Sequence, residues 1–148
     1  MVEFRLRPAE QYDFPAIRSL IHTVGINPTG LHWRRFIVAI STKGEILGCG
    51  QIKPHSDGSL ELASIAVIAK ARGAGIARGI IEILLNRETT RPVYLMCRAQ
   101  LEPLYNKFEF RVINAEEMPQ YFRRIHNIAK IFNLNSLPEE QLIVMRLQ

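Results

Sequence analysis

The sequence of 148 residues has no long apolar run, since no stretch approaches the ~18 residues that a membrane-spanning helix needs. Its first residues also lack the apolar core of a signal peptide. Cysteine is scarce: Cys49 and Cys97 are far apart in the sequence and do not have the spacing of a metal site. We therefore expect two buried free thiols, no bound metal and a reducing compartment. These features favour a cytoplasmic protein without membrane contact, with an organelle or plastid form as the alternative.

Acidic residues are outnumbered by basic ones, with 14 Asp and Glu against 19 Lys and Arg and a formal net charge of +5. This balance suits an anionic partner. The arginines are scattered rather than gathered with exposed aromatic residues on one element, which disfavours nucleic acid as that partner. The length and the apolar fraction of 47% indicate one globular domain over residues 1–148, as a monomer or a homodimer.

Apolar periodicity divides the chain into strands and helices. Alternating and short apolar runs predict seven strands, over residues 3–7, 35–41, 46–53, 60–68, 92–98, 110–113 and 141–147. Helical spacing of apolar residues predicts helices over residues 11–24, 75–86, 101–107 and 119–133. This order predicts an α/β (α+β) fold: a single mixed, twisted sheet of about seven strands with helices on both faces.

A glycine-rich turn joins the predicted strand over residues 60–68 to the predicted helix over residues 75–86. The first N–H groups of a helix lack intrahelical acceptors, and the helix dipole places partial positive charge there. Gly73 and Gly75 carry no side chains where an anion would approach the backbone. The turn therefore predicts a site for a phosphorylated ligand.

The spacing of this turn argues against two common phosphate-binding loops. A P-loop needs four residues between its glycines and then Lys followed by Ser or Thr, but one residue separates Gly73 from Gly75. A dinucleotide fingerprint has Gly or Ala three positions after the second glycine, where Arg78 stands here. No well-placed acidic residue follows either, so the dinucleotide interpretation is disfavoured.

The segment Arg72-Gly73-Ala74-Gly75-Ile76-Ala77 resembles the acyl-CoA pyrophosphate loop of the GNAT superfamily of N-acetyltransferases. Lys70 stands where that family usually has Gln or Arg, which keeps the charge but loses the planar fork. A second segment, residues 101–110, resembles the family's Tyr-x-Lys-x-Gly-Phe motif, with Glu109 in place of the glycine. Both segments occur in the family's order, so the resemblance spans nearly the whole chain.

The resemblance implies a GNAT fold, with the fourth and fifth strands splayed apart for the pantetheine arm, and acetyl-CoA as co-substrate. A backbone N–H near Ile65 would face the thioester oxygen, and backbone groups of Ala66 and Val67 would pair with the pantetheine amides. The implied pyrophosphate-binding residues are Lys70, Arg72, Gly73, Ala74, Gly75, Ile76 and Ala77.

Two residues are candidates for proton transfer. Tyr105 lies where the resemblance puts the family's general-acid tyrosine, and the alternative is a helix tyrosine that packs on neighbouring apolar residues. Glu61 lies near the start of an apolar strand, where the family's general base often lies. Glu61 is either that base or a strand-end glutamate paired with an arginine, and many family members use ordered water instead.

Histidines give weaker signals. We interpret His55-Ser56-Asp57 as an ordinary turn, because adjacency in a turn is not the geometry of a catalytic triad. His126 is expected on a solvated basic face of the last helix, or else in an acceptor site. The sequence thus predicts an N-acetyltransferase acting on a primary amine that it does not identify, with a non-catalytic acyl-CoA-binding module of the same fold as the alternative.

Overall fold

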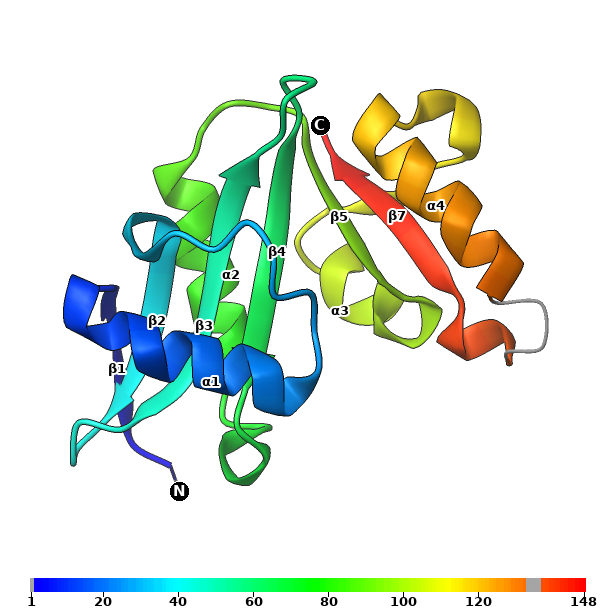
Figure 1. The fold of residues 1–148 in the computed structure, drawn as a ribbon. Helices are drawn as coiled ribbons and strands as arrows, with labels where there is room; N and C mark the ends of the chain where they lie inside the picture. Colours follow the sequence, from blue (N-terminus) through cyan, green and yellow to red (C-terminus); the bar gives the residue numbers. More distant parts are fainter. Residues whose placement is uncertain (1, 133–136) are drawn as a thin grey trace. The chain divides into compact units, whose positions relative to one another are not determined.

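The computed structural model describes residues 2–132 and 137–148, and these form seven strands and four α-helices (Figure 1). The strands are β1 (Phe4–Pro8), β2 (Phe36–Ser41), β3 (Ile46–Pro54), β4 (Leu60–Val67), β5 (Val93–Arg98), β6 (Arg111–Val112) and β7 (Leu142–Leu147). The helices are α1 (Phe14–Val24), α2 (Ile76–Arg87), α3 (Glu102–Asn106) and α4 (Gln120–Phe132). Every predicted element is present, although Asn133, the predicted end of the last helix, lies outside the described residues.

The strands form one mixed, open sheet in the order β1-β2-β3-β4-β5-β7-β6. Most recorded pairs are antiparallel, including β1 with β2, β2 with β3, and β7 with both β5 and β6. Strands β4 and β5 pair in parallel, at Leu60 with Val93 and at Glu61 with Tyr94. This arrangement confirms the predicted fold class.

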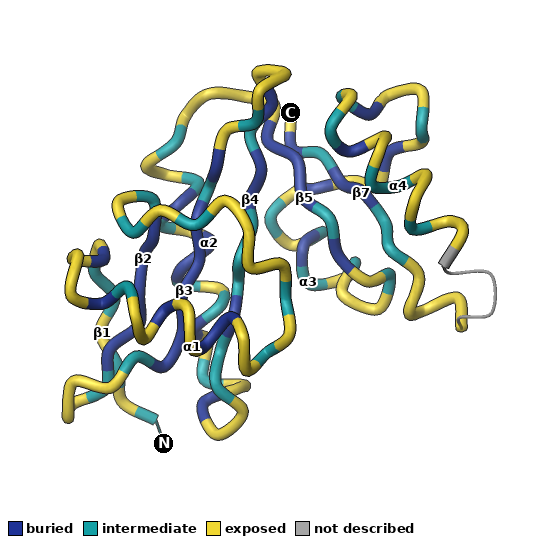
Figure 2. Tube along the Cα trace, in the orientation of Figure 1, coloured by how far each residue is buried: buried dark blue, intermediate teal, exposed yellow. Residues whose placement is uncertain are grey.

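Two compact units make up the chain: unit 1 contains residues 1–53 and 62–89, and unit 2 contains residues 54–61 and 90–148. In unit 1, α1 covers one face of the strands and α2 covers the other (Figure 1). Strand β2 is therefore buried on both faces, and its first five residues are all buried (Figure 2). A continuous apolar run is what a strand covered on two faces requires.

Glycines on β3 bring α2 close to the sheet in unit 1. A Cβ on Gly48 would lie 2.7 Å from Ile76 Cγ2, and one on Gly50 would lie 2.8 Å from Ile80 Cγ2. Both distances are shorter than packed carbon atoms tolerate, so larger residues would push α2 outward. These glycines therefore set the distance between the sheet and the first turns of α2, the helix that follows the glycine-rich turn.

The core of unit 2 lies where α4 packs on the strands, and Phe122 is its fully buried centre. Apolar residues at helical spacing predicted this helix, but one of them, Ile128, is 55% exposed, whereas His126, expected on a solvated face or in an acceptor site, is half-buried. The physical reason is helical spacing: His126 lies four residues after Phe122 and shares its face, whereas Ile128 lies six residues after it and does not.

Candidate active site

The glycine-rich turn of unit 1 joins β4 to α2, as the sequence predicted, and both of its glycines have a left-handed backbone. After β4, a 3₁₀ turn (Ala69–Ala71) leads to Gly73 and Gly75, which have φ angles of +84° and +87°. Gly75 is the residue that immediately precedes α2. A Cβ added to either glycine would meet nothing within 4 Å. The glycines are therefore required by their left-handed backbone, and the space above them is open to a ligand.

Hydrogen bonding inside the turn decides which amides are available. The Arg72 N–H donates to Ala69 O at 3.3 Å, and the Arg72 side chain donates through Nε to Val67 O at 3.3 Å. The hydrogen bonds of α2 begin with the Gly79 N–H, which donates to Gly75 O at 3.0 Å. The first N–H groups of α2 precede this bond and lack intrahelical acceptors. The amides that remain available to the predicted anion site are thus those that follow Arg72.

Lys70 forms an ion pair across the surface of unit 1. Its Nζ lies 3.2 Å from Glu45 Oε2, and the two side chains are 69% and 51% exposed. Exposed pairs of this kind contribute less than about 1 kcal/mol. A phosphate can therefore compete with Glu45 for Lys70, so the ion pair is compatible with the predicted role of Lys70 in binding a pyrophosphate.

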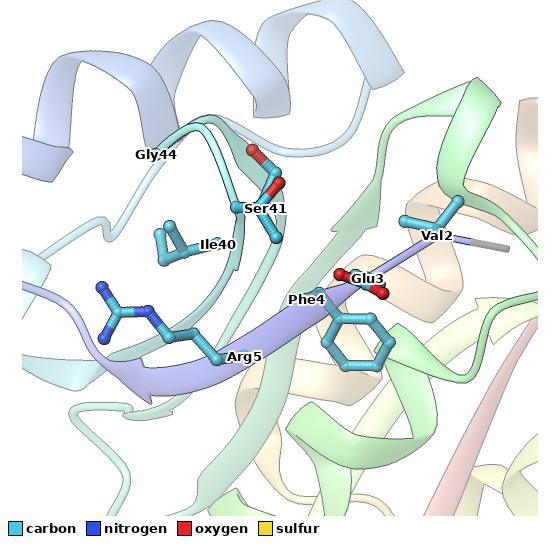
Figure 3. A pocket seen from close by; sticks show the side chains of 8 residues that line it. Val2, Glu3, Phe4, Arg5, Ile40, Ser41 and Gly44 are labelled. Atoms are coloured by element: carbon cyan, nitrogen blue, oxygen red, sulfur yellow. The ribbon is translucent and has the colours of Figure 1, made fainter.

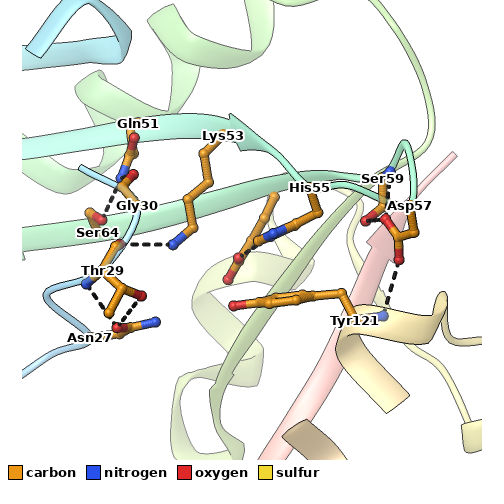
Figure 4. Close-up of polar contacts among 11 residues, drawn as sticks. Asn27, Thr29, Gly30, Gln51, Lys53, His55, Asp57, Ser59, Ser64 and Tyr121 are labelled. Carbon is orange, nitrogen blue, oxygen red and sulfur yellow. Dashed lines mark hydrogen bonds and ion pairs between the residues drawn. The ribbon is translucent and has the colours of Figure 1, made fainter. Parts of the chain in front are cut away.

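Strand β4 is irregular just before the predicted thioester-binding residues. Ser64 has a φ of +60°, in the left-handed region that side chains rarely adopt. The Gln51 Nε2 group donates to Ser64 Oγ at 2.9 Å and to Gly30 O at 3.3 Å (Figure 4). A left-handed residue redirects the backbone groups that follow it in a strand. In this chain those groups belong to Ile65, Ala66 and Val67, the residues predicted to contact the thioester and the pantetheine arm.

Glu61 is the centre of a polar cluster in unit 2. The residue is 6% exposed, and its Oε1 lies 2.7 Å from His55 Nε2. The His55 ring stacks on the Tyr121 ring, with centroids 3.5 Å apart and planes inclined by 18° (Figure 4). His55 is therefore one ion-pair partner of Glu61. A buried carboxylate beside an imidazole is a pair that can accept and hold a proton.

Asp57 ties this cluster to the start of α4. Its carboxylate accepts hydrogen bonds from Ser59 N at 2.9 Å, Ser59 Oγ at 2.6 Å and Tyr121 N at 3.0 Å. Burial alone would raise the pKa of Asp57, but these hydrogen bonds and the nearby His55 hold it below its usual value. Burial, together with the charge of Glu61, raises the pKa of Tyr121. The hairpin between β3 and β4 therefore positions both the Glu61 pair and the ring stacked on it.

Sequence reasoning found Glu61 but missed His55 and Tyr121. The signal for His55 was available in the Asp57-Gly58 turn: His55 N donates to Ser59 O at 2.9 Å, which closes a short hairpin. His55 opposes Ser59, and Glu61 lies two residues further along the same face, so the two side chains are diagonal neighbours. Tyr121 carried no comparable signal, because its position depends on tertiary contacts between α4 and the hairpin.

Tyr105 lies on α3 in unit 2 and is 7% exposed. Its ring meets Phe110 edge-on, with centroids 6.2 Å apart. Burial, with a smaller contribution from the charge of Cys97, raises the pKa of Tyr105 well above that of a free phenol. Tyr105 thus stays protonated at neutral pH.

Both cysteines are free and buried, as expected, and burial raises the pKa of each to about 12.

A further hollow of about 740 Å³ lies at the edge of unit 1, between residues 2–5 and the chain around Ile40, Ser41 and Gly44 (Figure 3). None of the predicted site residues lines it. Glu3 and Arg5 supply its only charged side chains among the lining residues, so we assign no chemistry to it.

Among the described residues, no helix combines the length and apolar character needed to cross a membrane.

Comparison with known proteins identifies the family. Residues 32–112, more than half of the chain, match the model of the acetyltransferase (GNAT) domain. The chain therefore belongs to the GNAT acetyltransferase family. No match is found among curated proteins.

Solved structures with the same fold include complexes with coenzyme A. Rv2747 from Mycobacterium tuberculosis, in complex with CoA and NLQ, is 21% identical with a TM-score of 0.71, over 97% of this chain and 98% of that one. N-acetylglutamate synthase from Neisseria gonorrhoeae, complexed with coenzyme A and N-acetyl-glutamate, is 19% identical with a TM-score of 0.71, over 100% of this chain. The match spans 36% of the synthase, about a third of its length. Escherichia coli ElaA is 16% identical with a TM-score of 0.67, over 100% of both chains.

Proposed function

We propose that this chain is an acetyl-CoA-dependent N-acetyltransferase that transfers the acetyl group directly to a primary amine of a small molecule, peptide or protein. The observation that carries the proposal is the turn before α2, with two left-handed glycines beneath open space. Membership of the GNAT family and the coenzyme A in related complexes support it.

In this proposal the donor is held by backbone groups of unit 1. The amides that follow Arg72, from Gly73 to Ala77, bind the pyrophosphate at the start of α2. The side chains of Lys70 and Arg72 add positive charge near this position. Ala66 and Val67 pair with the pantetheine amides, and the Ile65 N–H stabilises the oxyanion that forms on the thioester carbonyl.

The amine must lose a proton before it can attack, because alkylamines titrate near ~10.4. Glu61 is the proposed general base, and its 2.7 Å contact with His55 lets the pair share the proton. The amine nitrogen bonds to the carbonyl carbon, the carbon–sulfur bond breaks, and coenzyme A leaves as its thiolate. The nitrogen loses two protons overall: the first passes to the Glu61–His55 pair before attack, and the second, released once the carbon–nitrogen bond has formed, passes to solvent.

Tyr105 is the proposed donor to the departing sulfur. Its raised pKa keeps the phenol protonated, but it also makes complete transfer of that proton to a thiolate near ~8.5 unfavourable. We therefore assign Tyr105 a hydrogen bond that stabilises the thiolate, with full protonation left to solvent.

The release of free thiol from acetyl-CoA tests the proposal. The wild-type protein is mixed with acetyl-CoA and with a panel of primary amines, and a thiol reagent follows coenzyme A. Release that depends on both protein and amine supports acetyl transfer. Equal release with and without amine, or none with any amine, contradicts it.

A further inference from the structure

Lys53, on β3 in unit 1, is a buried lysine that the mechanism above does not use. The residue is 5% exposed, and its Nζ donates one hydrogen bond, to Thr29 O at 3.2 Å (Figure 4). An ammonium group has three N–H donors, so two remain for another acceptor. None of the ion pairs recorded among residues 2–132 and 137–148 includes Lys53. A buried cation is costly unless an anion or several acceptors compensate it.

Gln51, two residues earlier, lies on the same face of β3. Where Lys53 has unused hydrogen-bond donors, Gln51 has an unused acceptor. Its Nε2 donates to Gly30 O, which only accepts, so the orientation of the amide is fixed. Its Oε1 is buried and has no donor among the described residues. Lys53 and Gln51 thus bind the successive carbonyl groups of Thr29 and Gly30 and still offer free donors and a free acceptor.

Gly30 leaves space beside the ammonium group. A Cβ at this position would lie 3.1 Å from Lys53 Nζ and 3.3 Å from Lys53 Cδ. Gly30 is exposed and has a φ of +68°, so its backbone also disfavours a side chain. A ligand atom in this space would lie at hydrogen-bond distance from the Lys53 ammonium.

We propose that Lys53 binds a carboxylate of the amine acceptor, which makes the acceptor an amino acid; this inference rests on the proposed acetyl transfer. The carboxylate takes the two remaining Lys53 donors beside Gly30, and Gln51 Oε1 accepts from an N–H of the same molecule. Gln51 also contacts Ser64, which immediately precedes Ile65 on β4. The acceptor's amino group therefore lies toward the residue assigned to the thioester oxygen, with its carboxylate at Lys53.

Matched substrates test this assignment. Alanine, leucine, lysine and glutamate are compared with their carboxamides as acceptors for acetyl-CoA, using the full chain. We expect kcat/KM to favour the carboxylates by about 10- to 100-fold, the range for a charged hydrogen bond. Lys53→Met removes this preference while leaving carboxamide turnover measurable, and Lys53→Arg retains part of it. Lys43→Met, at an exposed lysine, leaves the preference unchanged.

The outcomes separate this inference from the proposed function. If Lys53→Met lowers turnover of carboxylates and carboxamides equally, Lys53 only holds Thr29 in place and the inference is overturned. A wild type that acetylates carboxamides equally well also overturns it but leaves acetyl transfer standing. If the wild type acetylates neither set, acetyl transfer fails, and calorimetry with N-acetyl amino acids decides the site. Binding that Lys53→Met weakens about tenfold or more supports a carboxylate site, and binding that is absent or unchanged overturns it.

Discussion

Glu109 shows how a single residue departs from the family pattern without changing the turn. It has a φ of +73°, the left-handed conformation that glycine adopts readily. The turn is closed by Glu109 N donating to Asn106 O at 3.0 Å and Phe110 N donating to Tyr105 O at 3.2 Å. The geometry that follows Tyr105 is therefore kept, and the cost of about 1 kcal/mol falls on stability.

Glu109→Gly is expected to raise the free energy of unfolding by roughly 0.5–1 kcal/mol, because it removes the left-handed strain. Denaturant melts of both proteins measure the change. Glu88→Gly is the control, since Glu88 has a φ of –101° and carries no such strain. A Glu109→Gly variant no more stable than the wild type would mean that the strain is relieved in another way.

Tyr105→Phe is expected to lower kcat by about 10²-fold, because the thiolate loses its hydrogen-bond donor. The affinity for acetyl-CoA should stay the same, since the phenol acts only as sulfur departs. Thiol release and calorimetry measure the two quantities. Tyr12→Phe, at a residue that is 75% exposed, is the matched control. An unchanged kcat would return Tyr105 to a purely packing role.

At the scale of elements, the turn before α2 allows a comparison of two glycines with the same strain. Gly73 and Gly25 have φ angles of +84° and +81°, and a Cβ at either position meets nothing within 4 Å. Alanine should therefore cost both sites a similar stability, about 1 kcal/mol. Only Gly73→Ala should weaken acetyl-CoA binding, because its methyl group occupies the approach to the amides. Equal acetyl-CoA affinities in calorimetry would show that the turn does not bind the donor.

The stability of the protein should depend on pH through Asp57, whose carboxylate accepts a hydrogen bond from Tyr121 N at the start of α4. The folded pKa of Asp57 lies below its unfolded value of about 3.8, so its stabilising effect is complete above that pH and is lost as pH falls through the folded value. Asp57→Asn should lower stability at neutral pH and flatten the decline below about pH 4. Acid titrations of the unfolding free energy measure this, with Glu139→Gln, at an exposed residue, as the control. An unaltered decline in Asp57→Asn would exclude Asp57 as its source.

Most elements could be predicted from sequence because local signals determine them. Short apolar runs located β2 and β3, and the spacing of Gly73 and Gly75 located the turn before α2. The contact between His55 and Glu61 was missed because it depends on hairpin register, which the period of a strand alone does not give. The exposure of Ile128 was missed for a related reason, because apolar residues along a helix do not reveal where its partner surface ends.

At the scale of the whole molecule, the sequence predicted the fold class and the family but not the acceptor. The donor loop is a contiguous segment with a recognisable spacing, whereas Lys53 and Gln51 gain meaning only when the chain at Thr29 and Gly30 folds over them. A net charge of +5 suited an anionic ligand without saying where it binds. The proposed recognition of the acceptor thus depends on tertiary structure.

The central claim is that an acetyl group passes from acetyl-CoA to an amine nitrogen. Mass spectrometry of reactions with acetyl-CoA labelled with carbon-13 in the acetyl group tests it most directly, with free amino acids among the amines. We expect a labelled N-acetyl product that forms with the wild type and about 10²-fold more slowly with Tyr105→Phe. A protein that binds acetyl-CoA but yields no labelled product with any amine would contradict the claim and would instead be an acyl-CoA-binding module.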